Sequence, residues 1–280
     1  MGRRLDGYHL LESFFWPLDF SDDIFIKTSA GEFQTKWGAD SLFPESPLPN
    51  AAENICATAY RWVEERVGKG ELSSVSLEKR IPIGGGLGGG SSNAGTLLRE
   101  LSRRYQLDST AVEAFAVTLG ADVSYFLSPV PAWVTGIGEK REPVEVSATL
   151  QSQLRFLLVF PPFSTSTNEI FAEFKKTHHE VAKREKAPVP KLENLNSLSQ
   201  LLRTARNDLL PCVQARHPLI PHIINALRDS GSLFATLSGS GSTCFGIFEN
   251  DSSCNQALKD LQQFFRKNDC KSLMTRTFQD

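Results

Sequence analysis

The residues with the clearest chemical meaning form a glycine-rich run at positions 84–90, which Ser91 and Ser92 follow directly. Six of these seven residues are glycine. Ordered glycine costs conformational entropy, so a run of this kind needs a physical reason. Backbone N–H groups without a neighbouring Cβ can converge on an anion, and a helix that begins at Ser91 or Ser92 adds the positive end of its dipole. These residues predict a phosphate-binding loop, with one of the two serines capping the helix.

Three other interpretations of the run are open. The glycines match the dinucleotide-binding pattern G-x-G-x-x-G, but so many glycines match it trivially, and the acidic residue expected about 20 positions later would fall at the end of a helix instead of a strand. The Walker A pattern requires Gly-Lys-Ser/Thr, and no lysine stands there. A flexible linker would lack regular flanks. Here a predicted strand enters the run and a predicted helix leaves it, which favours the phosphate loop.

The elements that must position this loop have recognisable patterns. Residues 75–81 predict a strand that leads into the glycines, and apolar residues at positions 94, 97, 98 and 101 share one face of a helix that follows them. Residues 175–196, rich in Lys, Glu, Pro and His, predict a solvated, mobile insertion. The other predicted elements are strands joined by a turn within residues 10–27, helices over residues 51–68 and 109–119, a buried strand over residues 154–160, two helices after residue 196, and strands on either side of a glycine-rich turn within residues 233–248.

Composition narrows the class of protein. The 280 residues are 40% hydrophobic and 22% charged, with a formal net charge of −2, as in a soluble globular protein. The chain has no dominant basic block, so nucleic acid is not an expected partner. Five scattered cysteines without a Cys-x-x-Cys pair indicate free thiols instead of disulfides or a zinc site. No apolar run has the length of a membrane span, so no membrane partner is expected and the protein is expected to be cytoplasmic.

Four stretches of the chain together resemble the GHMP kinases, which include galactokinase and the homoserine, mevalonate and phosphomevalonate kinases. Residues 82–94, P-x-GGGLGGGSSNA, resemble their phosphate loop, in the form found in the branch that acts on a cytidyl-diphosphate-linked methylerythritol. Asp6-Gly7-Tyr8-His9 resembles the substrate-side signature of that branch. LGADV at residues 119–123 resembles the segment with its catalytic aspartate. LSGSG at residues 237–241 resembles the third family motif, which usually has a threonine between the glycines.

The resemblance implies an α+β, two-domain GHMP kinase fold, which we place at residues 1–148, like domain 2 of ribosomal protein S5, and residues 149–280. It implies transfer of the γ-phosphoryl group of ATP to the 2-hydroxyl of the cytidyl-diphosphate methylerythritol, a small-molecule substrate of non-mevalonate isoprenoid synthesis. Mg²⁺ would arrive on the nucleotide, since no dedicated metal cage is visible in the sequence. A monomer or weak homodimer is expected. The alternatives are a GHMP kinase for another small alcohol and a catalytically impaired nucleotide-binding homologue.

The same resemblance gives roles to particular residues. Asp122 would be the base that accepts the proton of the substrate hydroxyl, although alone it would be interpreted as a helix cap. Asn54 would lie near adenine, or else be a solvent-facing helix residue. The substrate would contact Tyr8, His9, Ile137, Thr167 and Phe171. Ordinary packing is the alternative for Tyr8, His9 and Phe171. The nucleotide phosphates would contact Pro82, Gly84, Gly85, Gly86, Leu87, Gly88, Gly89, Gly90, Ser91 and Ser92, with Gly239 and Gly241 behind this loop.

One part of the family pattern does not match. The pattern begins upstream of Asp6 with a strand bearing Pro-Ala-Lys-x-Asn, whose lysine lies near the acceptor hydroxyl, whereas this sequence starts with Met1-Gly2-Arg3-Arg4 and its first lysine is Lys27. Either the natural start lies further upstream, or the active site lacks this cation. We favour the first explanation because the other motifs are intact. We expect the 280-residue chain to be impaired as a catalyst even if it binds nucleotide.

Overall fold

The structure is a computed structural model that describes residues 11–50, 53–136, 138–177 and 189–279. Within them the strands form three sheets, ordered β2-β4-β3, β1-β5-β6 and β10-β7-β9-β8. The strands are β1 (Leu11–Phe15), β2 (Asp23–Ala30), β3 (Phe33–Trp37), β4 (Ser73–Lys79), β5 (Ala132–Gly136), β6 (Lys140–Pro143), β7 (Arg155–Phe160), β8 (Phe234–Leu237), β9 (Cys244–Phe248) and β10 (Lys271–Arg276). The helices are α1 (Ile55–Val67), α2 (Gly89–Arg104), α3 (Ser109–Leu119), α4 (Ala148–Gln153), α5 (Thr167–Thr177), α6 (Leu195–Thr204), α7 (Leu210–Arg216), α8 (Leu219–Asp229), α9 (Asp251–Asp260) and α10 (Gln262–Lys267), with a 3₁₀ turn, η1, at Tyr125–Leu127.

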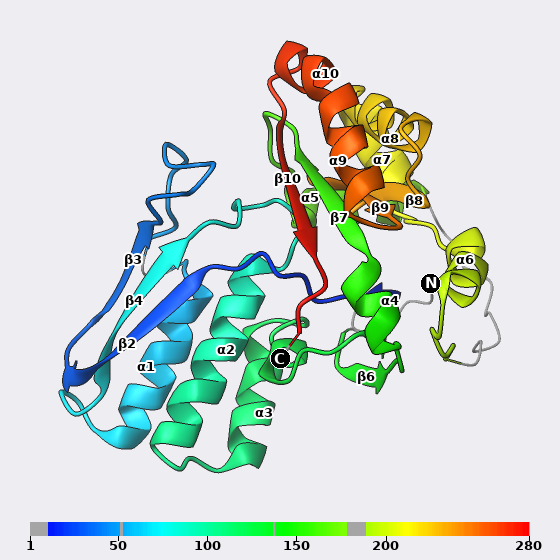
Figure 1. Ribbon diagram of the computed structural model, residues 1–280. Coiled ribbons are helices and arrows are strands. Elements are labelled where there is room, and N and C mark those ends of the chain that lie inside the picture. The colour runs from blue at the N-terminus through cyan, green and yellow to red at the C-terminus, as the bar shows by residue number, and fades with distance from the viewer. Residues whose placement is uncertain (1–10, 51–52, 137, 178–188, 280) are drawn as a thin grey trace.

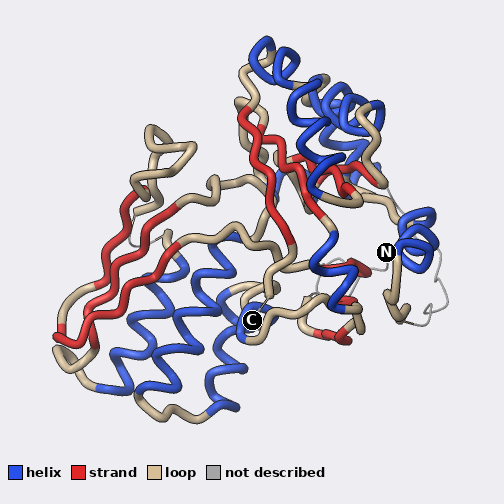
Figure 2. Tube along the Cα trace, in the orientation of Figure 1, coloured by secondary structure: helices blue, strands red, loops and turns tan. Residues whose placement is uncertain are grey.

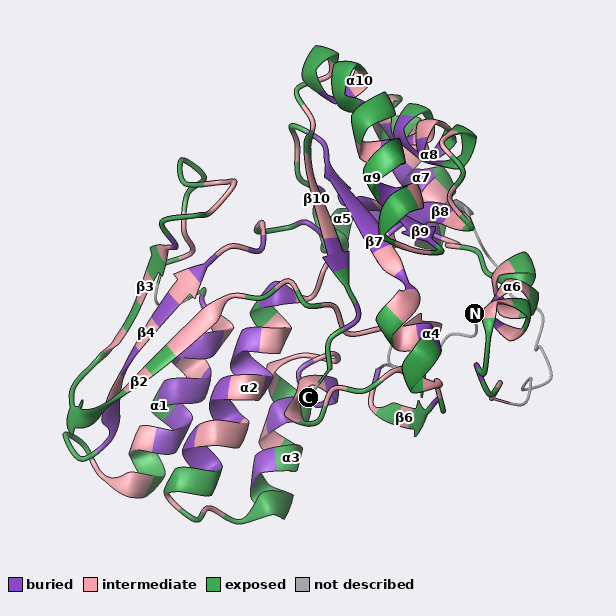
Figure 3. Ribbon diagram, viewed as in Figure 1, coloured by how far each residue is buried: buried purple, intermediate pink, exposed green. Residues whose placement is uncertain are grey.

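The first half of the chain places α1, α2 and α3 side by side on one face of the β2-β4-β3 sheet (Figures 1 and 2). β4 is the central strand, antiparallel to β2 and parallel to β3. Its buried and half-buried residues alternate, and Val75 and Leu77 pack against buried residues of α1 and α2. Figure 3 shows the buried stripe along each of these helices, which is the core of this layer. This layer holds the segment from β4 to α2 that contains the glycine run.

The second half is built on the antiparallel β10-β7-β9-β8 sheet. β7 has the sequence RFLLVF, and five of its six residues are buried because both faces of the strand are covered. Leu157 and Val159 pack in a core with helices of the second half. Phe156 and Phe160 pack in a core that includes aromatic residues from the first 43 residues, so this second core joins the two halves.

Several predicted elements are confirmed and others are corrected. The helix at 109–119 and the buried strand at 154–160 are present, the strand one residue shorter. The two strands predicted within residues 10–27 are present and lie in different sheets, because β1 pairs with β5 and β2 pairs with β4. In the described residues, three helices, not two, lie between residues 195 and 229. The prediction of a solvated, mobile insertion is wrong for residues 189–196, which the structure describes. Leu192 is fully buried there, and its backbone forms a β-bridge with Val146.

No helix within the described ranges combines the length and apolar character that a membrane crossing requires.

Candidate active site

The glycine run has an unusual backbone. Gly84, Gly86 and Gly88 have φ angles of +70°, +74° and +67°, and the intervening Gly85 and Leu87 do not have positive φ. A side chain at φ near +70° is strained, so this alternating backbone requires glycine at these positions. Backbones that alternate in this way turn successive N–H groups toward one concavity, which suits an anion. The loop that contains these glycines therefore has the local geometry expected of a phosphate-binding loop.

Helix α2 begins earlier than the sequence predicted. Gly88, not a serine, is the N-cap residue, and no side chain caps the helix. The predicted cap at Ser91 or Ser92 is wrong because both serines lie in the first turn, where Ser92 N–H already donates to the carbonyl of Gly88 at 2.8 Å. A left-handed glycine supplies the N-cap instead. The uncapped first-turn N–H groups remain available to a ligand, and this turn contains no acidic residue.

A second glycine-rich turn, residues 238–242, holds the first from behind. Ser238 Oγ donates to the carbonyl of Gly86 at 2.8 Å, and Thr243 N–H donates to the carbonyl of Gly85 at 3.1 Å. A Cβ added to Gly86 would lie 2.3 Å from the carbonyl oxygen of Ser238 and 2.6 Å from that of Gly241. The two turns thus touch through backbone atoms, and the structure brings Gly239 and Gly241 to the back of the predicted phosphate loop.

Asn207 supports this second turn. Its amide nitrogen donates to the carbonyls of Leu237 and Gly239 at 2.9 and 2.7 Å, and its amide oxygen accepts from Leu209 N–H at 2.9 Å. The sequence offered no local signal for this role, because Asn207 lies 32 residues before Gly239.

Residues 163–167 form the third segment at the same place. Thr165 Oγ1 donates to the carbonyl of Ser240 at 2.9 Å, and the hydroxyls of Thr167 and Ser240 are 2.8 Å apart. Thr167, which we predicted to line the substrate pocket, therefore has its hydroxyl bonded to the second glycine turn. Phe171, on α5, is half-buried and packs at the edge of the second-half core.

Asp122 precedes the η1 turn, where its carbonyl accepts from Tyr125 N–H at 3.1 Å. Burial raises the pKa of its carboxyl group. No side chain among the described residues donates a hydrogen bond or forms an ion pair with this carboxyl. The surrounding segment packs on α2, since a Cβ added to Gly95 would lie 2.8 Å from the carbonyl oxygen of Val123. The carboxyl is therefore held on a segment that contacts the helix following the glycine loop.

Asn54 has a structural role that the sequence interpretation missed. It is 8% exposed, so the expected solvent-facing alternative is wrong. Its side-chain oxygen accepts from Cys56 N–H at 3.0 Å and caps α1, and its amide donates to Thr35 Oγ1 at 3.1 Å. This cap explains why α1 begins at Ile55 and not at residue 51.

Three other residues predicted to contact the substrate, Tyr8, His9 and Ile137, lie outside the described residues.

Asp22 has a buried carboxylate and lies between β1 and β2, where the sequence predicts only a turn. It accepts from the backbone N–H groups of Arg80 and Ile81 at 2.6 and 2.8 Å, from the Asn93 amide at 2.6 Å, and from Lys79 Nζ. These donors flank the glycine run on both sides. No motif marks Asp22, because its partners are 57 to 71 residues away.

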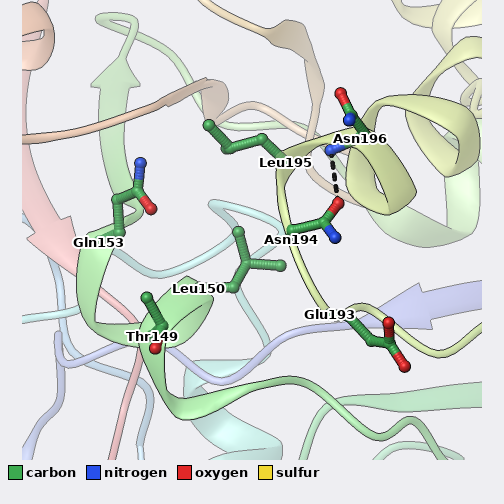
Figure 4. A pocket seen from close by; sticks show the side chains of 7 residues that line it. All are labelled: Thr149, Leu150, Gln153, Glu193, Asn194, Leu195 and Asn196. Atoms are coloured by element: carbon green, nitrogen blue, oxygen red, sulfur yellow. Dashed lines mark hydrogen bonds between the residues drawn. The ribbon is translucent and has the colours of Figure 1, made fainter.

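The described residues contain no group of three or more His, Cys, Asp or Glu side chains arranged to hold a metal ion. A separate pocket lies between α4 and α6 (Figure 4), lined by Thr149, Leu150, Gln153, Glu193, Asn194, Leu195 and Asn196. There Asn194 accepts from Asn196 N–H at 3.0 Å and caps α6. None of these lining residues belongs to the glycine-rich turns, so the pocket is not part of the candidate active site.

Comparison with known proteins agrees with this geometry. A family model described as "GHMP kinases N terminal domain" matches residues 54–128, and one described as "GHMP kinases C terminal" matches residues 188–267. The two matches contain the glycine loop, Asp122 and the second glycine turn. The chain belongs to the GHMP kinases, and it is therefore a small-molecule kinase that uses ATP.

Within that family, two curated relatives and one solved structure are kinases of a cytidyl-diphosphate-linked methylerythritol. A 4-diphosphocytidyl-2-C-methyl-D-erythritol kinase of Chelativorans sp. (strain BNC1) is 36% identical over 267 residues, which cover 92% of this chain and 85% of the relative. The kinase of the same name from Prosthecochloris aestuarii is 35% identical over 274 residues, covering 95% and 90%. A crystal structure of 4-(cytidine 5'-diphospho)-2C-methyl-D-erythritol kinase superimposes with a TM-score of 0.70 at 25% identity, over 99% of this chain and 94% of that one. Homoserine kinase from Cytophaga hutchinsonii, 16% identical, shares the fold with a TM-score of 0.66 over 94% of this chain and 88% of that one.

Proposed function

We propose that the chain transfers the γ-phosphoryl group of ATP to the 2-hydroxyl of 4-diphosphocytidyl-2-C-methyl-D-erythritol, a step of non-mevalonate isoprenoid synthesis. The observation that carries the proposal is the loop of left-handed glycines at an uncapped helix N-terminus, held from behind by a second glycine turn. The kinase name shared by relatives that match most of the chain supports the choice of substrate.

In this proposal the loop residues contribute positioning and charge neutralisation. The free N–H groups of the loop and of the first turn of α2 face the nucleotide phosphates, and they offset the negative charge of the transferring group. The bond between the γ-phosphorus and the β–γ bridging oxygen breaks, the bond to the substrate oxygen forms, and ADP leaves. Charge neutralisation of this kind needs no movement of the protein, because the second glycine turn already fixes the loop.

Asp122 receives the proton of the substrate hydroxyl. Because burial raises the pKa of its carboxyl group, Asp122 is a stronger base than an exposed aspartate. Among the described residues no cation is paired with it, so we expect slow turnover. Mg²⁺ would arrive with ATP and neutralise phosphate charge when bound. Ser91 and Ser92 are the oxygen-bearing side chains that we propose as its contacts, since Mg²⁺ prefers oxygen ligands.

The remaining assignments follow from resemblance and stand as proposals. Asn54 lies on the adenine side, while Tyr8, His9 and Phe171 hold the cytosine with Thr167 and Ile137 as further walls. Stacking between a base and an aromatic ring supplies affinity in this arrangement. We further propose a domain boundary at residues 148–149, a cytoplasmic location, and action as a monomer or weak homodimer.

Steady-state release of ADP from Mg-ATP tests the proposal. We expect release only when 4-diphosphocytidyl-2-C-methyl-D-erythritol is present, and not with homoserine or mevalonate. Asp122→Asn should reduce the rate of this release by about a hundredfold or more. Asp229→Asn, at the exposed end of α8, is the matched control that should retain it. Release that depends on homoserine or mevalonate would identify another alcohol as the substrate. If the chain binds nucleotide but releases no ADP with each of the three alcohols in turn, the non-catalytic alternative is supported.

A further inference from the structure

The carboxylate of Asp22 is the point where the two ends of the glycine loop meet. The side chain of Asp22 is fully buried, and each of its oxygens accepts from two donors. Oδ1 accepts from the backbone N–H groups of Arg80 and Ile81, just before the loop. Oδ2 accepts from the side chains of Lys79 and of Asn93, which follows the loop in α2. One side chain outside the loop therefore binds its beginning and its end.

The charges at this point are balanced. A carboxylate close to a phosphate-binding loop would repel the phosphates if its charge were uncompensated. The ammonium group of Lys79, itself 7% exposed, forms an ion pair with Asp22. A buried carboxylate is tolerated only when it is paired and hydrogen-bonded, and Asp22 meets both conditions. The loop is thus anchored by an ion pair with no net charge.

We propose that Asp22 is a positioning residue for the phosphate loop: it fixes residues 79–81 and Asn93 so that the N–H groups between them converge on the nucleotide. The proposal rests on the proposed function, because it assigns the nucleotide phosphates to this loop. Asp22 itself touches neither substrate nor nucleotide in this role. Its effect reaches the reaction through the shape of the loop, where a small displacement is costly.

The substitution Asp22→Asn tests this role with almost no change in volume. An asparagine side chain has one acceptor oxygen, so its NH₂ group must face either the two backbone N–H groups or Lys79 and Asn93. Either orientation sets donors against donors and leaves the Lys79 charge unpaired. The double variant Asp22→Asn/Asn93→Asp restores the pattern, because the amide introduced at position 22 can accept from the backbone and donate to a carboxylate at position 93, which pairs with Lys79.

Two measurements separate positioning from general stability. Hydrogen exchange of peptides covering residues 79–93 in nucleotide-free protein reports the order of the loop, and calorimetric titration with Mg-ATP reports binding. We expect Asp22→Asn to accelerate exchange in these peptides and to weaken Mg-ATP binding by about tenfold or more. We expect the double variant to recover most of both losses. Asn93→Ala, which removes one donor and keeps the ion pair, should produce a smaller change in the same direction and remains informative if Asp22→Asn does not fold.

The control is Val112→Ala on α3, which truncates a buried residue in the apolar core of the first half. It should lower the thermal midpoint while leaving exchange at residues 79–93 and Mg-ATP binding close to those of the parent chain. The proposal is overturned if Asn93→Ala leaves exchange at residues 79–93 as in the parent chain, if the double variant recovers none of the losses caused by Asp22→Asn, or if Val112→Ala weakens Mg-ATP binding equally. Loop exchange is read without ligand, so failure of the parent chain to bind ATP or to release ADP would count against the proposed function and not against the anchor.

Discussion

The contact between the two glycine turns predicts a large effect for Gly86→Ala. The added Cβ would lie 2.3 Å from the carbonyl oxygen of Ser238, so the turns must separate by about 1 Å to reach ordinary van der Waals distance. Separation breaks the hydrogen bonds that the carbonyls of Gly86 and Gly85 accept from Ser238 and Thr243, each worth about 0.5–1.5 kcal/mol. A left-handed alanine adds about 1–2 kcal/mol. The free energy of unfolding should therefore fall by about 2–5 kcal/mol.

Gly231→Ala is the matched control. Gly231 has a φ of +86°, but a Cβ there would meet nothing within 4 Å, so only the backbone strain of about 1–2 kcal/mol remains. Urea denaturation gives the two losses of stability, and ADP release gives the activities. Displacement of the loop by about 1 Å should reduce kcat/KM by about a hundredfold in Gly86→Ala and leave Gly231→Ala close to the parent chain. Equal stability and equal activity of the two variants would refute the argument that backbone contact between the turns shapes the loop.

Three further expectations concern residues around the loop. Asp122→Asn should reduce kcat by about a hundredfold or more without changing Mg-ATP affinity. Burial raises the pKa of Asp122 above its ordinary 3.8, so the native state loses stability as pH rises from this ordinary value through the shifted pKa. The asparagine variant should therefore be the more stable protein at neutral pH and show no advantage in stability below the ordinary pKa. Asn207→Asp points a carboxylate at the carbonyls of Leu237 and Gly239, so it should lower the free energy of unfolding by about 1–3 kcal/mol. Urea denaturation measures this loss, and an unchanged midpoint would contradict the role given to the Asn207 amide. Phe171→Leu keeps apolar packing but removes the ring, so KM for the cytidyl substrate should rise by the equivalent of about 1–3 kcal/mol while KM for ATP stays constant; a parallel rise in both would argue against stacking on cytosine.

Local patterns predicted those parts of the fold whose cause is local. The helix at 109–119 has its cap at Asp108 and its end at Gly120, and the apolar run of β7 marks a strand covered on both faces. The position of the glycine loop between a strand and a helix was also predicted. In each of these cases the deciding residues lie within one element or next to it.

The remaining features depend on contacts between distant residues. The start of α2 at Gly89 follows from the left-handed Gly88, and the sequence pattern did not distinguish this glycine from its five neighbours. Asp22 and Asn207 have ordinary turn sequences, and their partners are set by tertiary packing. Burial of Leu192 within a charged stretch is another tertiary effect, since one apolar residue does not alter the composition of the segment.

The hydrogen bond from Ser238 to Gly86 joins residues 152 positions apart, and this separation has a consequence for the order of folding. The N-terminal layer has its own apolar core and can collapse while the rest of the chain is still being synthesised. The second glycine turn can contact the glycine loop only after residues 238–243 have been synthesised. The contact then brings together two distant parts of the chain, which carries an entropic cost. A nascent chain that ends before residue 238 would thus contain Asp122 and α2 without a formed phosphate loop. The chain therefore becomes able to bind nucleotide late, when the β10-β7-β9-β8 sheet packs against the first half.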